Sequence, residues 1–510
     1  MTSLLRFHGR APARALASLL VVSTLALAAS AQSELVGTWD GTYEPPGVVG
    51  GDPFSLQITA QEGERVRGTV VLPELTASLE GRFDRARGVL TGTLTSSEEP
   101  VTIEWTLAGD ALRGSGTGGP WQWAFRATRA SVEVLPRDHS PRLVDLSEAE
   151  RPATYDLEGL DTELAIALDE LVRASAEKND VVGLSVAVVI DGKLVDVRSL
   201  GWEDFFAGTP ASGETRYRWA SISKPLTATA ALRLAARGGL DGGGLDLDCD
   251  VRSLVPEFPA KQVGEASARI TPRQILCHQS GIVHYEGATR VWREYPEPYP
   301  FEHLVNALDV FASAPLLFAP GTRQSYSTHA WSLLGLALER AAKQPYPELV
   351  RALVLEPAGM RQTEPDFLSR SIPHRSKGYE TNDAGKLIEV FGDDVAWKLP
   401  GGGWISTVGD LARFGAALCG PALLDEAQQE AAWTRQRLAD GKETDVGLGF
   451  FLEELDGRRL VSHSGGQRKA SSFLAVLPEE HLAVAVMSNT ARTPMGELAR
   501  AALRLLLAGR

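Results

Sequence analysis

Two patterns of hydrophobic and polar residues divide the chain. Between residues 34 and 130, apolar and polar residues alternate in short runs separated by turns rich in Gly, Asp and Glu, for example Ser55–Thr59, Arg67–Leu72 and Val101–Leu107. Alternation with a period of two is typical of half-buried β-strands, and strands at this spacing are typical of a small barrel or sandwich. The sequence therefore predicts a small, all-β, barrel-like domain over residues 34–130.

The segment 131–160 has no sustained period. It carries charged residues and the prolines Pro136, Pro141 and Pro152, and we predict a linker there. The apolar spacing of an amphipathic helix follows over Thr162–Lys178. All ten lysines of the chain lie at Lys178 or later, and this step in composition supports a separate domain over residues 161–510.

Strand patterns lie at both ends of this second domain. A hairpin is predicted for Gly183–Ile190 and Lys193–Val197, joined by the turn signal Asp191-Gly192. Four more strands precede a closing helix near the C-terminal end: Val446–Leu452, Arg459–His463, Ser471–Leu477, Leu482–Met487 and the helix Pro494–Leu507. The patterns between are mainly helical. We predict an α+β fold with an antiparallel sheet flanked by helices and a helical lobe.

The first 31 residues have the pattern of a signal peptide. Arg6, Arg10 and Arg14 precede an apolar run over residues 16–29, which ends in small residues. The run is shorter than the roughly 20 residues that a membrane-spanning helix needs, so we expect cleavage and no stable membrane insertion afterwards; an uncleaved anchor is the alternative. The pattern predicts an exported protein, periplasmic or secreted.

Charge and composition argue against several classes of function. The formal net charge is −14, or −17 without the three N-terminal arginines, so the protein repels phosphate backbones and nucleic acid is not expected as a partner. Three widely spaced cysteines do not indicate a disulfide framework. The nine histidines lack metal-binding spacings, so no metal or other cofactor is expected. The oligomeric state stays open.

Ser221 and Lys224 are the first candidates for chemistry. They lie three apart at the start of an Ala- and Leu-rich helical run, Pro225–Arg237, so the amine can reach the hydroxyl. An ordinary N-cap serine is the alternative. Ser175 and Lys178 have the same spacing but lie at the polar end of a helix, and we interpret them as a solvated surface pair.

Two further elements could complete a site. Tyr326 precedes the helical run His329–Ala342, and its phenol could relay protons if a cation such as Lys224 lowered its pKa. His463 ends a predicted strand and is followed by Ser464, Gly465 and Gly466. The two glycines let a substrate approach the backbone. Taken singly, a packed loop tyrosine and a hydrogen-bonded histidine are the simpler interpretations.

In this order and spacing, the three elements resemble the Ser-x-x-Lys, Tyr-x-Asn and Lys-Thr-Gly or His-x-Gly set of penicillin-recognising enzymes. The resemblance is closest to the class C β-lactamase-related serine hydrolase family and covers about residues 160–510. Supporting segments are Arg218–Lys224, Gly239-Leu240, Ile270–Pro272 and Ile275–Ile282. His284-Tyr285-Glu286 and Gly401–Gly403 look most like the mitochondrial serine β-lactamase-like branch. The opening segment Gly37–Gly41 resembles the first strand of a calycin-type barrel.

The resemblance implies roles for the matching residues. Ser221 is expected to be the nucleophile, Lys224 to take its proton, and Tyr326 to return a proton to the leaving group. The backbone N–H groups of Ser221 and Gly466 are expected to form the oxyanion hole. Further pocket residues implied in this way are His463, Ser464, Gly465 and Thr328. His278 is interpreted as structural.

Two departures from the family pattern bear on the substrate. Thr328 stands where many relatives have Asn, and its hydroxyl offers fewer hydrogen-bonding groups. His463 stands where penicillin-binding relatives have Lys and is mostly neutral at pH 7, so a fixed cation for a substrate carboxylate is missing unless Arg468 or Lys469 supplies it.

We therefore predict a serine hydrolase that attacks an ester or amide through an acyl-enzyme, acting on a small-molecule or peptide substrate. Hydrolysis of β-lactams is compatible with these residues but is not the expected activity. The absence of a Gly-x-Ser-x-Gly elbow argues against an α/β-hydrolase. The alternative from another class is a catalytically reduced ligand-binding or scaffolding protein of the penicillin-binding fold.

Overall fold

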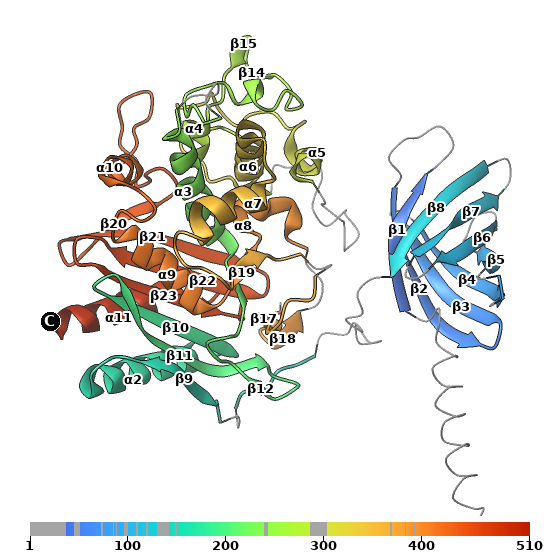
Figure 1. Ribbon diagram of the computed structural model, residues 1–510, viewed down its shortest axis with the longest axis horizontal. Helices are drawn as coiled ribbons and strands as arrows, with labels where there is room; N and C mark the ends of the chain where they lie inside the picture. Colours follow the sequence, from blue (N-terminus) through green and yellow to red (C-terminus); the bar gives the residue numbers. More distant parts are fainter. Residues whose placement is uncertain are drawn as a thin grey trace, which may run out of the picture. The chain divides into compact units, whose positions relative to one another are not determined.

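The computed structural model describes residues 37–44, 52–72, 75–84, 86–87, 89–95, 100–108, 111–118, 121–129, 142–147, 150–238, 243–285, 303–367, 370–382, 384–390 and 394–509. The chain forms two compact units, residues 1–137 and 138–510, whose elements are drawn in Figure 1. The predicted signal peptide lies outside the described residues. Within those residues, no helix is long and apolar enough to cross a membrane.

The first unit contains a closed barrel of eight antiparallel strands. Each strand pairs with the next along the chain, and β8 pairs with β1 to close the barrel. Buried side chains at alternate positions, such as Leu56 and Ile58, Val66 and Val70, fill its interior together with Trp105. The predicted all-β fold of this region is confirmed. The strands are β1 (Gly37–Glu44), β2 (Asp52–Glu62), β3 (Arg65–Leu72), β4 (Leu75–Asp84), β5 (Val89–Thr95), β6 (Val101–Ala108), β7 (Ala111–Gly118) and β8 (Trp121–Arg129).

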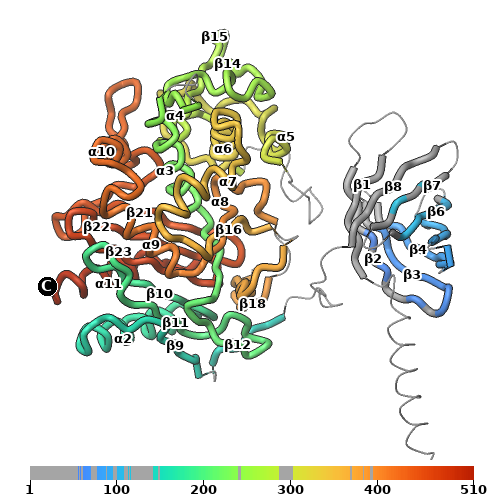
Figure 2. Tube along the Cα trace, in the orientation of Figure 1, coloured from blue at the N-terminus to red at the C-terminus, as the bar shows by residue number. Residues whose placement is uncertain are grey.

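The second unit is built around an antiparallel sheet that joins both ends of this unit's chain. Its strand order is β12-β11-β10-β23-β22-β21-β20, and β9 pairs with β11. In Figure 2 the early strand β10 lies in the same layer as the C-terminal strands. The strands are β9 (Ala153–Glu158), β10 (Gly183–Ile190), β11 (Lys193–Asp204), β12 (Thr209–Pro210), β20 (Phe451–Leu455), β21 (Arg458–Gln467), β22 (Ala470–Leu477) and β23 (Leu482–Ser488).

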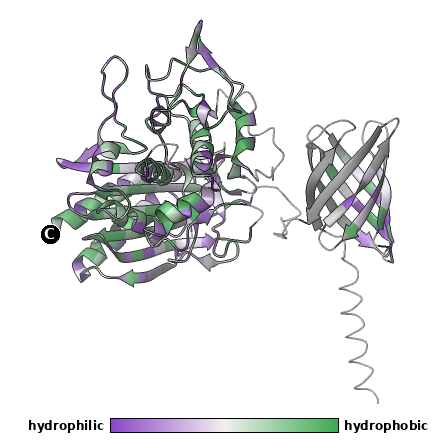
Figure 3. Cartoon of the chain, turned by 45° about the horizontal axis from the view of Figure 1, so that its top comes forward, coloured by the Kyte–Doolittle hydropathy of each residue, from purple (hydrophilic) through white to green (hydrophobic). Residues whose placement is uncertain are grey.

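The central strands are apolar throughout because both faces of the sheet are covered (Figure 3). Val186 and Val484 face helices α2 (Thr162–Lys178) and α11 (Met495–Ala508), whereas their neighbours Ala187 and Ala485 face the larger core on the other side. Helix α9 (Val408–Leu418) packs on that second face. The predicted α+β fold, with an antiparallel sheet flanked by helices, is confirmed.

A helical lobe extends beyond α9. Its core continues from the second face of the sheet and includes Trp331 and Phe311. The helices are α3 (Ser223–Ala235), α4 (Pro272–Leu276), α5 (Leu308–Phe311), α6 (Thr328–Ala342), α7 (Tyr346–Val350), α8 (Leu399–Gly402) and α10 (Glu426–Trp433). The small sheets are β13 (Tyr217–Arg218) with β19 (Trp404–Ser406) and β16 (Glu364–Pro365), β14 (Lys261–Val263) with β15 (Ala266–Ala268), and β17 (Gly378–Thr381) with β18 (Leu387–Val390). Cys249, Cys277 and Cys419 are free.

The linker prediction for residues 131–160 is wrong over Ala153–Glu158. These residues form the edge strand β9, which pairs with β11. An edge strand buries little, and four of its six side chains are exposed, so it lacks the apolar alternation that reveals a strand in a sequence. Val144, also in the predicted linker, is buried against Trp202 and Tyr379.

The strand predicted for Val446–Leu452 begins later, at Phe451. Gly449 interrupts the pattern because its φ is +89° and a Cβ there would lie 2.3 Å from the Cβ of Ala228 on α3. Only glycine allows this approach of the backbone to α3.

Replacing Gly449 with alanine should destabilise the second unit. We expect a loss of about 3 kcal/mol in the free energy of unfolding, because backbone strain and overpacking both contribute. Gly457→Ala is the matched control, since Gly457 has φ of +78° but nothing within 4 Å of an added Cβ. That control should lose only about 1 kcal/mol. Denaturant unfolding measures both values, and equal losses would contradict the close approach to α3.

Candidate active site

Ser221 lies at the turn where β13 leads into α3. A 3-10 turn, Ala220–Ile222, carries it, and Ala220 has a left-handed φ of 49°. A residue with a side chain is strained in this region and is held there by its surroundings. Trp219 N–H donates to the carbonyl oxygen of Trp404 (2.8 Å), and the Ser472 hydroxyl donates to that of Trp219 (2.7 Å). These contacts fix the position of Ser221 at the start of α3.

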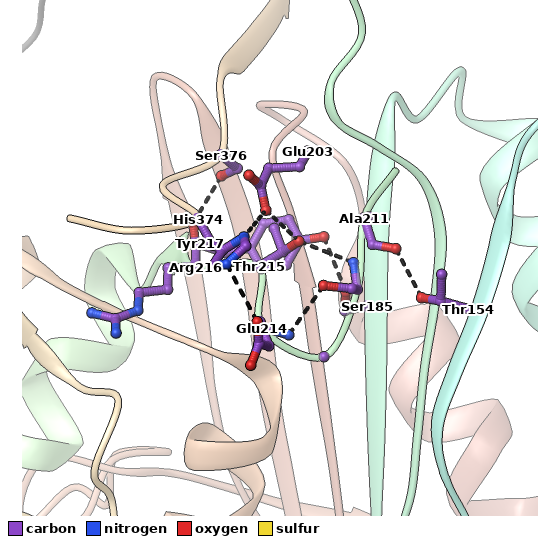
Figure 4. A network of polar contacts seen from close by, with 12 residues as sticks. Thr154, Ser185, Glu203, Ala211, Glu214, Thr215, Arg216, Tyr217, His374 and Ser376 are labelled. Atoms are coloured by element: carbon purple, nitrogen blue, oxygen red, sulfur yellow. Dashed lines mark hydrogen bonds and ion pairs between the residues drawn. The ribbon is translucent and has the colours of Figure 1, made fainter. Parts of the chain in front are cut away.

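Hydrogen bonds also anchor the segment ahead of Ser221 to the main sheet (Figure 4). The Tyr217 hydroxyl lies 3.0 Å from Ser185 Oγ on β10, and the Thr215 hydroxyl donates to the Glu203 carboxylate on β11 over 2.8 Å. Burial raises the pKa of Tyr217, so its phenol stays neutral. The segment that carries the nucleophile candidate is thus tied to strands β10 and β11 of the main sheet.

Lys224 is fully buried one helical turn after Ser221. Its Nζ lies 3.1 Å from Ser221 Oγ, 3.1 Å from Thr328 Oγ1 and 2.7 Å from the carbonyl oxygen of Gly401. The two oxygens of Thr328 and Gly401 can accept the amine's hydrogens, which leaves the lone pair of a neutral amine for the Ser221 hydroxyl. This geometry lets Lys224 take the proton of Ser221.

The surroundings of Lys224 favour the neutral amine. Burial, and after it the positive charge of Lys398, hold the pKa of Lys224 well below its usual value. A lysine whose pKa is lowered by burial and by a second cation can act as a base near neutral pH.

Tyr326 lies beside this pair. Lys224 Nζ is 4.7 Å from the centroid of the Tyr326 ring, and the ring packs against His278 with 4.4 Å between centroids. Burial raises the pKa of Tyr326, and a hydrogen bond with Ser221 only partly opposes this. The hypothesis that Lys224 lowers the pKa of Tyr326 is therefore wrong: the phenol stays protonated and is suited to donate a proton.

Thr328 is buried and its hydroxyl contacts Lys224. Its backbone N–H donates to His284 Nδ1 over 3.2 Å. Thr328 therefore lies with the base, on the side of α6 that faces α8. Its predicted role in substrate binding stays a prediction.

Strand β21 brings the His463 segment to the same place. His463 is buried, its Nδ1 lies 2.7 Å from the carbonyl oxygen of Ser464, and burial and Lys224 lower its pKa to about 3. Gly465 is required by packing, because a Cβ there would lie 2.2 Å from the carbonyl oxygen of Trp219. Ser464 and Gly466 are exposed, and Gly466 has open space around its missing Cβ.

The structure adds residues that the sequence did not single out for chemistry. His284 contacts the start of α6. Its pKa is lowered to about 4, mainly by burial and to a smaller extent by the nearby Lys224. Lys398 at the start of α8 carries charge close to Lys224. Gln467 ends β21. None of them stands in a motif with a chemical meaning of its own, so only the fold reveals them.

Arg468 and Lys469, the two cations suggested for binding a substrate carboxylate, lie against β17. Arg468 forms an ion pair with Glu380 on β17 (3.2 Å), and Lys469 lies against Gly378 of the same strand. Within the described ranges, no cluster of three His, Cys, Asp or Glu side chains could hold a metal ion. Ser221, Lys224 and Tyr326 are the reactive side chains that the structure brings together.

Comparison with known families agrees with this geometry. The profile described as Beta-lactamase matches residues 168–509, which covers the main sheet and the helical lobe. The chain belongs to the β-lactamase family. The predicted relation to penicillin-recognising enzymes is confirmed, whereas the class C assignment stays a prediction.

The chain is similar to several named proteins. The human mitochondrial serine beta-lactamase-like protein LACTB is 29% identical over 383 residues, 58% of this chain and 69% of the relative. Esterase EstB of Burkholderia gladioli is 35% identical over 216 residues, 41% of this chain and 53% of the esterase. The crystal structure of D-amino acid amidase from Ochrobactrum anthropi SV3 superimposes with a TM-score of 0.56 at 20% identity, covering 68% of this chain and all of the amidase; it shows the shared fold.

The pH dependence of activity should reveal Lys224 as the base. Only the neutral amine accepts a proton, so kcat/KM should fall as the pH drops through the pKa of Lys224. His463 and His284, with pKa values of about 3 and about 4, are neutral near neutral pH and add no ionisation there. Lys398→Met removes a neighbouring positive charge, which raises the pKa of Lys224 and should move the acidic limb to higher pH. Profiles of kcat/KM with an uncharged ester measure the shift; an unmoved limb would contradict the role of Lys398 in lowering that pKa.

Proposed function

We propose that this β-lactamase-family protein is a serine hydrolase that forms an acyl-enzyme on Ser221 with an ester or amide substrate. The observation that carries the proposal is the buried Lys224 amine, 3.1 Å from Ser221 Oγ and held with a depressed pKa. A serine hydroxyl is a weak nucleophile until a neighbouring base removes its proton. Lys224 is such a base.

The proposed reaction has two steps. Ser221 Oγ attacks the substrate carbonyl as its proton passes to Lys224, and the oxyanion that forms accepts hydrogen bonds from the N–H groups of Ser221 and Gly466. Tyr326 donates its proton to the leaving group and regains one from Lys224. Water then attacks the acyl-serine, again giving up its proton to the Lys224 and Tyr326 pair, and Ser221 is regenerated.

Esters and amides are proposed ahead of β-lactams. Thr328 contacts Lys224 where many family members have an asparagine, and His463 is neutral where penicillin-binding members have a lysine. The names of the similar proteins, an esterase and a D-amino acid amidase, support both substrate types.

Labelling with a fluorescent fluorophosphonate tests the nucleophile. Wild-type protein should be labelled and should hydrolyse 4-nitrophenyl esters, whereas Ser221→Ala should lose labelling and at least about a thousandfold in kcat/KM. Ser175→Ala is the matched control because Ser175 has the same spacing to Lys178 on α2, and it should behave as wild type. Equal labelling of Ser221→Ala and wild type would refute the mechanism. If wild type is neither labelled nor active, the ligand-binding or scaffolding alternative is favoured.

We also propose export, supported by the signal-peptide pattern over residues 1–31. Expression in a Gram-negative host should place the protein in the periplasm, with a mature chain that begins close to Gln32. Fractionation and N-terminal sequencing measure this. A cytoplasmic protein that retains Met1 would contradict the proposal.

A further inference from the structure

Lys398 is a buried cation without an acidic partner. Its side chain is 7% exposed, and within the described part of the chain it has neither a hydrogen bond nor an ion pair. Its Nζ instead lies over two aromatic rings, 5.6 Å from the centroid of Tyr285 and 5.5 Å from that of Trp397. The face of an aromatic ring attracts an ammonium but takes up none of its N–H donors in an ordinary hydrogen bond, so these donors stay available. A group of this kind is suited to bind an anion.

Gln467 provides a second donor at the same place. Its Nε2 is buried and finds no hydrogen-bond acceptor among the described residues. Gly402 lies between the two side chains: a Cβ on Gly402 would be 3.4 Å from Lys398 Cδ and 3.6 Å from Gln467 Oε1. Lys398 and Gln467 therefore both border the position of the missing Gly402 Cβ. A 180° rotation of the Gln467 amide exchanges Oε1 and Nε2 and turns a donor towards this position.

This position borders the reacting groups. Gly402 directly follows Gly401, whose carbonyl oxygen holds Lys224. Gln467 directly follows Gly466, whose N–H is proposed to hold the carbonyl oxygen of the substrate. The acyl chain of a substrate begins at that carbonyl carbon, so it starts within reach of this position.

We propose that Lys398 and Gln467 form a subsite for a carboxylate on the acyl group of the substrate. The proposal rests on the proposed function and narrows the substrate class to esters or amides of acids that carry a second, negatively charged group. A carboxylate would accept hydrogen bonds from Lys398 Nζ and from Gln467 Nε2, and a charge-assisted bond of this type is among the stronger ones. The subsite supplies the fixed cation that His463 does not, while Arg468 is paired with Glu380.

A series of six-carbon substrates tests the subsite. The 4-nitrophenyl esters of adipate, hexanoate and 6-aminohexanoate carry negative, neutral and positive acyl chains of equal length. Wild type should prefer the adipate ester, mainly through a lower KM. Lys398→Met should reduce the adipate-to-hexanoate ratio of kcat/KM by about tenfold to a hundredfold, the value of a hydrogen bond to a charged group. The ratio cancels any change in the reactivity of Lys224.

Two further variants sharpen the test. Gln467→Glu is nearly isosteric and replaces a hydrogen-bond donor with a negative charge beside the proposed position of the substrate carboxylate. It should repel the adipate ester and shift the preference towards the 6-aminohexanoate ester. Arg468→Met is the matched control, because it removes the rival cation at the end of β21, and its ratio should stay within about twofold of wild type. An unchanged ratio in Lys398→Met, or a loss in Arg468→Met instead, would overturn the proposal.

A binding measurement separates this proposal from the proposed function. On the Ser221→Ala background, adipic acid monoamide should bind more tightly than hexanamide by calorimetry, and Lys398→Met should remove the difference. If wild type uses Ser221 but neither binding nor turnover favours the charged acyl chain, the subsite is wrong and the hydrolase proposal stands. If no ester is turned over and Ser221 is not labelled, the hydrolase proposal is wrong, and the amide titration alone decides whether the anion site exists.

Discussion

The candidate site is arranged around a buried amine. Lys224 Nζ is enclosed by Ser221 Oγ, Thr328 Oγ1 and the carbonyl oxygen of Gly401, which come from segments up to 180 residues apart in the chain. An ammonium in this place would be costly because water is excluded, so burial favours the neutral base that the proposed chemistry needs. The same packing that stabilises the fold therefore also favours the neutral form of Lys224.

The candidate site lies where the helical lobe meets the main sheet, and both parts of the fold contribute residues to it. Helices α3, α6 and α8 enclose Lys224, while β21 brings the exposed residue Gly466 to the same site. Gly465 and Gly449 let these layers approach, because a side chain at either position would collide with backbone or side-chain atoms near α3. The strained φ of Ala220 is maintained by this close packing.

Much of this arrangement could be predicted from the sequence. The apolar runs Gly183–Ile190 and Leu482–Met487 are buried on both faces and identify the central strands, and the order of Ser221, Tyr326 and His463 identified the candidate site. The edge strand β9 was missed because its side chains are exposed and do not alternate. The direction of the pKa shift of Tyr326 depends on burial, which the sequence does not give. Lys398 and Gln467 are far apart in the chain, and the fold brings both close to Gly402. No sequence motif links them.

The protonation state of Lys224 is the central claim, and it can be measured directly. The chain has only ten lysines, so NMR of protein labelled with 13C at the lysine ε-carbons, with Lys224→Met to assign the signal, can follow each amine through a pH titration. The structure predicts that the Lys224 signal titrates far below the usual lysine value, because the amine is buried and lies close to Lys398. A Lys224 signal that titrates near 10.5 would contradict the account, because a protonated amine has no lone pair with which to take the proton of Ser221.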